Sequence, residues 1–254
     1  MKTQDNVSDA LLKSRIQDAV RICWNNDYPQ FLGFLDEHQK ALSEIYFPKK
    51  HVQVQVCYWG GYPDAVRTVM GIFPEDYEYQ MEDFPIVPLE VLFTAKESLS
   101  HRDFLGSLMG LGMKREAVGD ILVGSGKCIV FVSNGVSEYI LTQWTKVGRT
   151  NIKCSLPAKL EISQTNGFLE ISGTVASPRL DCAVAAVLKT SRSSAVDLIT
   201  ERRVCVDFLE CTNASKLISD GKIISVRGYG KYIIDEIGSM TKKGRFILKA
   251  RKYL

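Results

Sequence analysis

The chain has 254 residues, of which 45% are hydrophobic and 24% are charged, a composition typical of one to three soluble globular domains. It has no apolar run of the roughly 20 residues that a membrane-spanning helix needs, and no apolar signal near its start. We therefore expect a cytoplasmic protein with no membrane partner. The seven cysteines include no C-x-x-C pair, so we expect neither a zinc site nor a disulfide framework, and no cofactor.

Positive charge is concentrated toward the C-terminal end. Residues 1–85 carry a net charge of −5 and residues 86–174 a net charge of +1, whereas residues 175–254 carry +7. A basic segment of this kind is typical of proteins that bind a polyanion. A basic surface that contacts only solvent would give the same net charge. Charge alone therefore does not distinguish a polyanion-binding segment from an ordinary surface, and the sequence motifs are needed.

Residues 1–85 are expected to form an N-terminal α/β domain. Apolar residues at three- and four-residue steps predict a helix over 8–24. A second helix is predicted to begin near Pro29, because proline suits the first turn of a helix. Two apolar segments follow, of which 51–59 alternates strictly with polar residues, and they predict a hairpin of strands over 51–59 and 67–74. An acidic stretch then marks the expected end of the domain.

The middle segment, residues 86–165, predicts a ferredoxin-like plait. The expected elements are a strand over 86–94, a helix over 100–113, two strands joined by the turn Gly124-Ser125-Gly126, a helix over 134–144 and a strand over 151–157. This β-α-β-β-α-β order is that of the ferredoxin-like plait. RNA-recognition modules (RRM-like folds) share the plait with many unrelated proteins, so the order alone predicts no function.

The last segment, residues 174–254, predicts two short helices followed by strands. Ser177-Pro178 is expected to start the first helix, and Ser191 is expected to cap the second. An alternating strand over 203–208 follows, and the basic tail predicts a final hairpin.

Arginines follow both predicted helix starts. A cation in the first turn opposes the helix macrodipole, at a cost of about 0.3–1 kcal/mol. The same position favours an anion, because free backbone N–H groups point outward there. We therefore expect Arg179 and Arg192 to contact phosphate rather than to support the fold, and we expect their replacement to leave stability unchanged or slightly higher. Two surface arginines without a partner are the alternative.

These motifs resemble the RNA-binding domain first seen in small-subunit ribosomal protein four, the S-four domain. The matching residues are Arg179-Leu180-Asp181, Ser191-Arg192, Ala195, Leu198-Ile199, Val204, Val206, Gly221 and Ile224-Ser225-Val226. Three positions depart from the family pattern. Arg202 stands where glycine is usual, Asp207 where asparagine is usual, and Lys222 where aspartate is usual, so the turn geometry at these positions is open.

A second resemblance extends over most of the chain. Residues 99–123, 28–39, 60–65 and 225–232 are similar to the YlmH-type proteins of bacteria and their photosynthetic relatives, although Val66 stands where that family more often has glutamate. The resemblance implies an α+β protein with an N-terminal α/β domain, an RNA-binding plait and a C-terminal S-four helix hairpin with a small sheet. It also implies a cytoplasmic role on ribosomal RNA or tRNA rather than on DNA.

The expected RNA contacts are basic residues, one serine and one aromatic residue that can stack on a base. Tyr229 lies between two cations in a glycine-containing loop, an arrangement that suits unpaired bases. The predicted RNA-binding residues are Arg179, Lys189, Ser191, Arg192, Arg202, Arg203, Lys222, Arg227, Tyr229, Lys231, Arg102, Lys114 and Arg115. His101 and Asp103 are the only acid–base candidates of the middle segment, but consecutive helix residues point in different directions. We therefore predict no catalytic residue.

The sequence thus favours a non-catalytic RNA-binding protein that acts on structured RNA of the translation machinery and is associated with the ribosome or a ribosomal subunit. One alternative is an RNA-modifying enzyme or its accessory, of the pseudouridine synthase or methyltransferase type. No glycine-rich cofactor loop follows a strand, which weighs against a methyltransferase. The other alternative is a cell-division adaptor that uses the acidic N-terminal domain.

Overall fold

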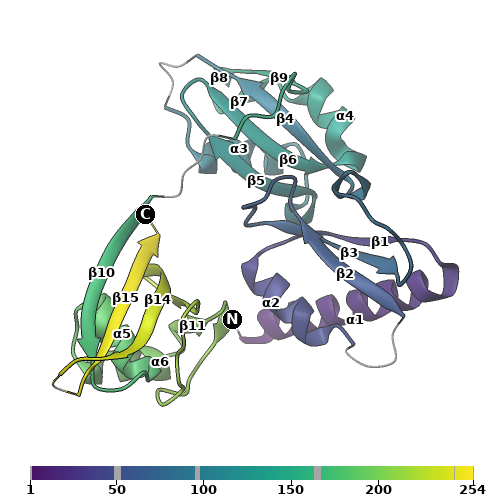
Figure 1. Cartoon of the computed structure of the whole chain (residues 1–254). Coiled ribbons are helices and arrows are strands. Elements are labelled where there is room, and N and C mark those ends of the chain that lie inside the picture. The colour runs from purple at the N-terminus through teal and green to yellow at the C-terminus, as the bar shows by residue number, and fades with distance from the viewer. Residues whose placement is uncertain (1, 49–52, 95–97, 163–166, 243, 254) are drawn as a thin grey trace. The chain divides into compact units, whose positions relative to one another are not determined.

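The computed structural model describes residues 2–48, 53–94, 98–162, 167–242 and 244–253. The chain forms two compact units, Met1–Gln164 and Thr165–Leu254 (Figure 1). The first is unit 1 and the second is unit 2, and each mixes helices with antiparallel sheets, as predicted. Of the helices that the structure describes, none is long and apolar enough to cross a membrane.

Unit 1 begins with a small helix-backed sheet. Its elements are α1 (Lys2–Asn26), β1 (Gln30–Leu35), α2 (Glu37–Tyr46), β2 (Val54–Trp59) and β3 (Thr68–Pro74). The strands lie in the order β1-β3-β2. The predicted hairpin is present, since β2 pairs antiparallel with β3. His51 and Val52 of the predicted first strand lie outside the described residues.

The helix predicted from Pro29 is wrong, because the chain forms strand β1 there and the helix begins only at Glu37. The reason is a capping box. The Asp36 carboxylate accepts a hydrogen bond from the Gln39 amide at 2.8 Å, and the Asp36 amide donates to the Gln39 side chain at 3.0 Å. This pair satisfies backbone groups that a helix leaves open at its start, so it fixes the boundary at Asp36.

The rest of unit 1 contains the predicted β-α-β-β-α-β order. Its elements are η1 (Met81–Asp83), β4 (Ile86–Leu92), α3 (His101–Gly110), η2 (Arg115–Ala117), β5 (Val118–Val123), β6 (Lys127–Ser133), α4 (Asn134–Gln143), β7 (Lys146–Val147), β8 (Thr150–Asn151) and β9 (Lys153–Ser155). The main sheet has the order β5-β6-β4-β9, and all its pairs are antiparallel. Helices α3 and α4 cover this sheet (Figure 1).

Strand β6 connects the two parts of unit 1 because its side chains alternate between two cores. Cys128, Val130 and Val132 pack in the core beneath α3 and α4. Ile129 and Phe131 pack on the other face, in a cluster with Phe34 and other aromatic residues of the N-terminal part. The expected domain boundary near residue 85 therefore lies inside one compact unit, and the division into domains at residues 85 and 165 stays a prediction.

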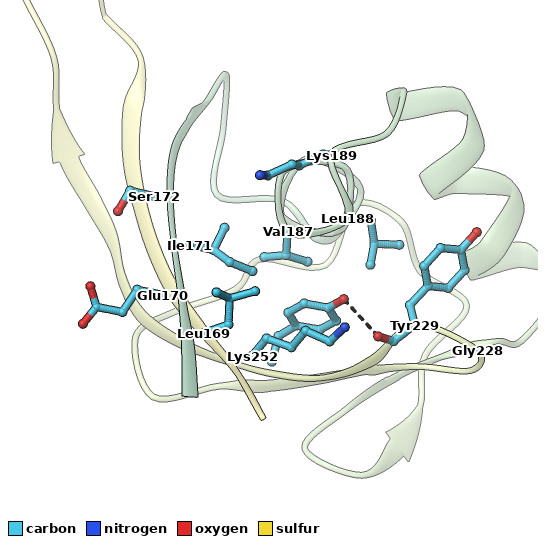
Figure 2. A pocket seen from close by; sticks show the side chains of 11 residues that line it. Leu169, Glu170, Ile171, Ser172, Val187, Leu188, Lys189, Gly228, Tyr229 and Lys252 are labelled. Carbon is cyan, nitrogen blue, oxygen red and sulfur yellow. Dashed lines mark hydrogen bonds between the residues drawn. The ribbon is translucent and has the colours of Figure 1, made fainter. Parts of the chain in front are cut away.

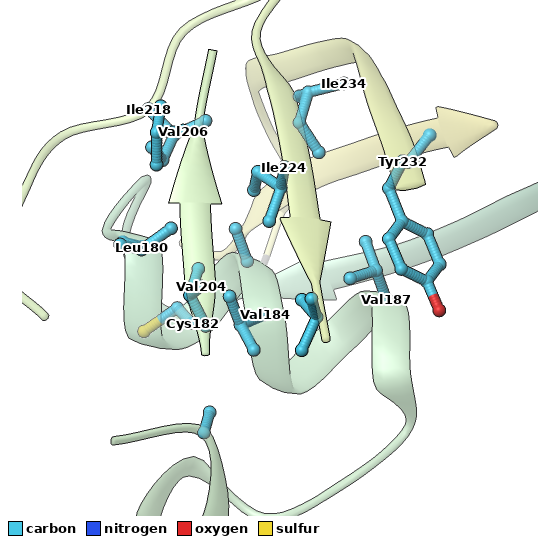
Figure 3. Close-up of a cluster of buried hydrophobic side chains, with 14 of the residues drawn as sticks. Leu180, Cys182, Val184, Val187, Val204, Val206, Ile218, Ile224, Tyr232 and Ile234 are labelled. Carbon is cyan, nitrogen blue, oxygen red and sulfur yellow. The ribbon is translucent and has the colours of Figure 1, made fainter. Parts of the chain in front are cut away.

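Unit 2 contains two short helices packed on a six-stranded sheet. Its elements are β10 (Phe168–Val175), α5 (Leu180–Leu188), α6 (Arg192–Thr200), β11 (Val204–Val206), β12 (Leu209–Glu210), β13 (Ile223–Val226), β14 (Gly230–Met240) and β15 (Phe246–Tyr253). The sheet order is β10-β15-β14-β13-β11-β12. Figure 3 shows Val184 of α5 close to Val204 of the sheet, and Val187 of α5 close to Tyr232. This core fixes the helix ends and the strand-connecting turns, where most of the predicted RNA-binding residues lie.

The turns that depart from the S-four pattern keep a backbone that favours glycine or asparagine. Arg202 has φ 59° and Asp207 has φ 48°, both in the left-handed region. The other two changes compensate each other, since the Lys222 ammonium lies 2.6 Å from the Asp207 carboxylate. Arg202 is not part of this pair. Among the three departures, it alone holds a long side chain at a left-handed φ value, which is a strained conformation.

Candidate nucleic-acid interface

The buried carboxylate of Asp181 binds both helix-start arginines. Asp181 is 1% exposed. Arg179 donates to its two oxygens at 3.2 and 2.9 Å, and Arg192 donates through Nε at 2.9 Å, with its Nη2 at 2.8 Å from Oδ2. The Cys182 amide adds a hydrogen bond of 2.8 Å. Burial alone would raise the pKa of Asp181, but these hydrogen bonds outweigh it and hold the pKa below its usual value.

This arrangement contradicts the expectation that Arg179 and Arg192 do not support the fold. Arg179 is the N-cap of α5 rather than a residue of its first turn, and Arg192 is the first residue of α6. Each guanidinium neutralises a carboxylate that would otherwise be buried without a partner, a penalty that exceeds the small macrodipole cost. The arginine side chains are still 33% and 56% exposed, so the cluster keeps a net positive charge that solvent can reach.

A basic groove lies where the segments around residues 203 and 227 meet. Strand β11 pairs with β13, and the Arg227 amide donates to the Arg203 carbonyl at 2.9 Å. A hollow of about 520 Å³ results, lined by residues that include Arg202, Arg203, Arg227, Tyr229 and Lys231. We call these five residues the arginine groove. All five were predicted as RNA contacts, and only the strand pairing brings them together.

The side chains of the arginine groove are held with their charges accessible. Arg203 donates to the Arg227 carbonyl at 3.1 Å, and the Arg202 guanidinium lies 3.2 Å from Glu210. The Lys231 ammonium lies 4.3 Å from the centre of the Tyr253 ring, a cation–π contact. The Arg227 guanidinium makes no hydrogen bond or ion pair with any residue that the structure describes.

Three other predicted residues of unit 2 have structural roles as well. Lys189 is the C-cap of α5, with φ 53°. The Ser191 hydroxyl accepts a hydrogen bond from the Ser194 amide at 3.0 Å and caps α6, as predicted. Lys222 is paired with Asp207. Lys189 is exposed and lines a second hollow together with Tyr229.

Arg102, Lys114 and Arg115 belong to unit 1 and are not gathered into one site. Arg102 is exposed on α3, and Lys114 is exposed before η2. The Arg115 guanidinium donates to the carbonyl groups of Val118 and Gly119. Burial lowers the pKa of Arg115. Arg115 therefore supports the turn before β5.

The sequence pattern gave no sign of a buried arginine in unit 1. Arg67 is 8% exposed and donates to the carbonyl groups of Val118, Phe34 and Arg115 at 3.1, 2.8 and 3.3 Å. Burial, reinforced by the nearby Arg115, lowers its pKa to about 10. Asp120 accepts hydrogen bonds from the Arg67 and Val66 amides and from the Tyr62 hydroxyl. The segment 60–67 thus joins the two parts of unit 1.

The acid–base candidates of the middle segment have separate environments. Asp103 accepts hydrogen bonds from the Ser100 amide and hydroxyl at 2.8 and 2.7 Å, which lower its pKa and cap α3. Burial, with the nearby Arg115, lowers the pKa of His101. Across the residues that the structure describes, no group of three His, Cys, Asp or Glu side chains could hold a metal ion.

Comparisons with known proteins place this geometry in context. Residues 79–160 match the family described as "Putative RNA-binding domain in YlmH". The chain is 28% identical over 225 residues to the "Ribosome-associated protein quality control protein P2" of Bacillus subtilis (strain 168), across 83% of this chain and 86% of that protein. The chain is thus similar to a YlmH-type protein over most of its length.

A solved structure agrees with this at the level of the fold. The "Cell division protein ylmH from Streptococcus pneumoniae" has a TM-score of 0.51 and 20% identity, and the match covers 59% of this chain and 92% of that one. The predicted resemblance to YlmH-type proteins is therefore confirmed, and the matched family region, residues 79–160, lies within unit 1.

Arg202 offers a test that separates binding from folding. Arg202→Gly should remove left-handed strain, and we expect the free energy of unfolding to rise by about 0.5–1 kcal/mol after the flexibility of glycine is counted. RNA affinity should fall nonetheless, because a cation leaves the groove. Thermal unfolding and RNA titration of the full chain measure both effects. Arg202→Ala is the matched control: it should lower affinity equally without raising stability. Unchanged affinity in both variants would remove Arg202 from the interface.

Proposed function

We propose that this YlmH-like chain is a non-catalytic RNA-binding protein that acts on structured ribosomal RNA or tRNA and associates with the ribosome or a ribosomal subunit in the cytoplasm. The observation that carries the proposal is the arginine groove, which places four cations and an exposed tyrosine on unit 2. Unit 2 has 15 Lys and Arg against 9 Asp and Glu, whereas unit 1 has 17 against 20. Binding to a phosphate backbone depends on such a local excess of positive charge.

The similarity to known proteins supports the same function. The Bacillus subtilis relative is named as a ribosome-associated quality control protein, and the matched domain is described as RNA-binding. Guanidinium groups form bidentate hydrogen bonds with phosphate, and short helices on a sheet can lie against a folded RNA and read its backbone shape. No step of this function needs a catalytic residue, a metal or a cofactor.

Ultraviolet crosslinking in cells, followed by sequencing of the attached RNA, tests the proposal. We expect fragments of ribosomal RNA or tRNA, crosslinked through peptides that contain residues 202–231. The chain should also co-sediment with ribosomal particles, and ribonuclease should release it from its partners. Association that survives ribonuclease, without crosslinked RNA, would instead indicate a protein adaptor and would contradict the proposal.

A further inference from the structure

A second hollow in unit 2 adjoins the arginine groove and has a different lining. Its volume is about 460 Å³, within the range of about 300–1,000 Å³ typical of sites for small organic groups. It lies between the end of α5, strand β10 and the turn at Tyr229 (Figure 2). Gly228 and Tyr229 line both hollows. We call this second hollow the tyrosine hollow.

Four apolar side chains form one part of the lining of the tyrosine hollow. Val187 and Leu188 come from α5, and Leu169 and Ile171 come from alternate positions of β10. Figure 2 shows Glu170 and Ser172 directed away from these side chains, as the two-residue period of a strand requires. Glu170 and Ser172 also line the hollow, so its β10 side contributes polar as well as apolar groups.

Tyr229 stands at the edge of the hollow on a fixed turn. Its neighbours Gly228 and Gly230 have φ values of 88° and 117°, which other residues rarely adopt. The Tyr232 hydroxyl donates to the Tyr229 carbonyl at 3.2 Å, shown as the dashed line in Figure 2. The Tyr229 side chain is nevertheless 46% exposed. A ring held by its backbone but open to solvent is suited to stacking on a flat partner.

Cations complete the lining. The exposed Lys189 lies at the α5 side, and Lys252 lies on β15 with its ammonium 5.9 Å from the centre of the Tyr232 ring. Together with the adjoining arginine groove, they would attract the phosphates on either side of a nucleotide. An apolar peptide would gain nothing from these charges.

We propose that the tyrosine hollow receives one unpaired base of the bound RNA, stacked on Tyr229, while its neighbouring phosphates lie along the arginine groove. This inference rests on the proposed function. Only an unpaired base can expose its ring face, because the faces of a paired base are covered by its neighbours in the helix. The ligand class is thus a structured RNA with a bulged or looped nucleotide next to a duplex.

Two RNA hairpins test the proposal: one has a bulged 2-aminopurine nucleotide, and the other differs only by an added uridine in the opposite strand that pairs with it. We expect the full-length chain to bind the bulged hairpin more tightly and to quench its fluorescence. Tyr229→Leu should lose the quenching and weaken binding of the bulged hairpin about tenfold or more, with little effect on the paired one. Tyr229→Phe, which keeps the ring, should behave like the natural chain.

Tyr139 provides a matched control, since it is 50% exposed on α4 of unit 1 and lines neither hollow. Tyr139→Leu should change neither affinity nor fluorescence, and the melting temperature of each variant checks its folding. Equal binding of the two hairpins by the natural chain, without quenching, would overturn the base site and leave the proposed function standing. Failure to bind either hairpin, or any ribosomal RNA fragment, would overturn both.

Discussion

Replacement of both Arg179 and Arg192 by glutamine is expected to lower the free energy of unfolding of unit 2 by about 2–4 kcal/mol. Removing the partners of a buried charge typically costs several kcal/mol, and the partial exposure of both arginines reduces that figure. Asp181 would keep the Cys182 amide but lose its ion pairs. Chemical denaturation of the full chain, followed by a signal from unit 2, measures the change.

The pH dependence of the same variants identifies the cause. In the natural chain the pKa of Asp181 is lowered, so its contribution to stability is present above the ordinary carboxyl pKa of 3.8 and is lost as the pH falls through the lower folded value. In the double variant the carboxylate is buried without cations, so its pKa should rise and acidification should cost less stability.

A third change serves as the control. Asp181→Asn added to the double variant removes the buried charge together with its partners, and it should recover part of the lost stability. If the double variant is as stable as the natural chain but binds RNA more weakly, the two arginines serve RNA alone and the structural role assigned to them is wrong.

The largest effect on RNA binding is expected from the arginine groove. Changing Arg202, Arg203 and Arg227 together to glutamine should weaken binding on the order of a hundredfold, at about 1 kcal/mol for each lost contact. Each lost phosphate contact should also flatten the plot of log affinity against log salt by roughly 0.7–0.9. The three substitutions together should therefore flatten the slope by about 2–3.

The matched control removes the same charge from another part of unit 2. Lys242, Arg245 and Lys249 are exposed on or next to the hairpin of β14 and β15, outside the arginine groove. Their replacement by glutamine should have a much smaller effect on affinity and salt slope. Equal losses in the two triple variants would mean that the RNA responds to net charge, and the groove would have no special role.

Local patterns in the sequence determined most of the elements. The hairpin of β2 and β3 and the order of the plait followed from residue periodicity and turn residues, which depend on neighbours along the chain. The helix predicted from Pro29 failed because β1 gains its stability from pairing with β3, a partner distant in sequence. The capping pair Asp36 and Gln39 was present as a local signal for the true helix start.

The sequence by itself also determined which family the chain resembles, and it predicted which residues would contact RNA, because cations, tyrosine and motif spacing are visible without coordinates. Only the tertiary structure decided how they are combined. Pairing of β11 with β13 gathers the arginine groove from segments more than twenty residues apart, and burial of Asp181 turns two apparently unfavourable arginines into ion-pair partners. Burial and long-range pairing depend on the whole fold, so no local pattern could specify them.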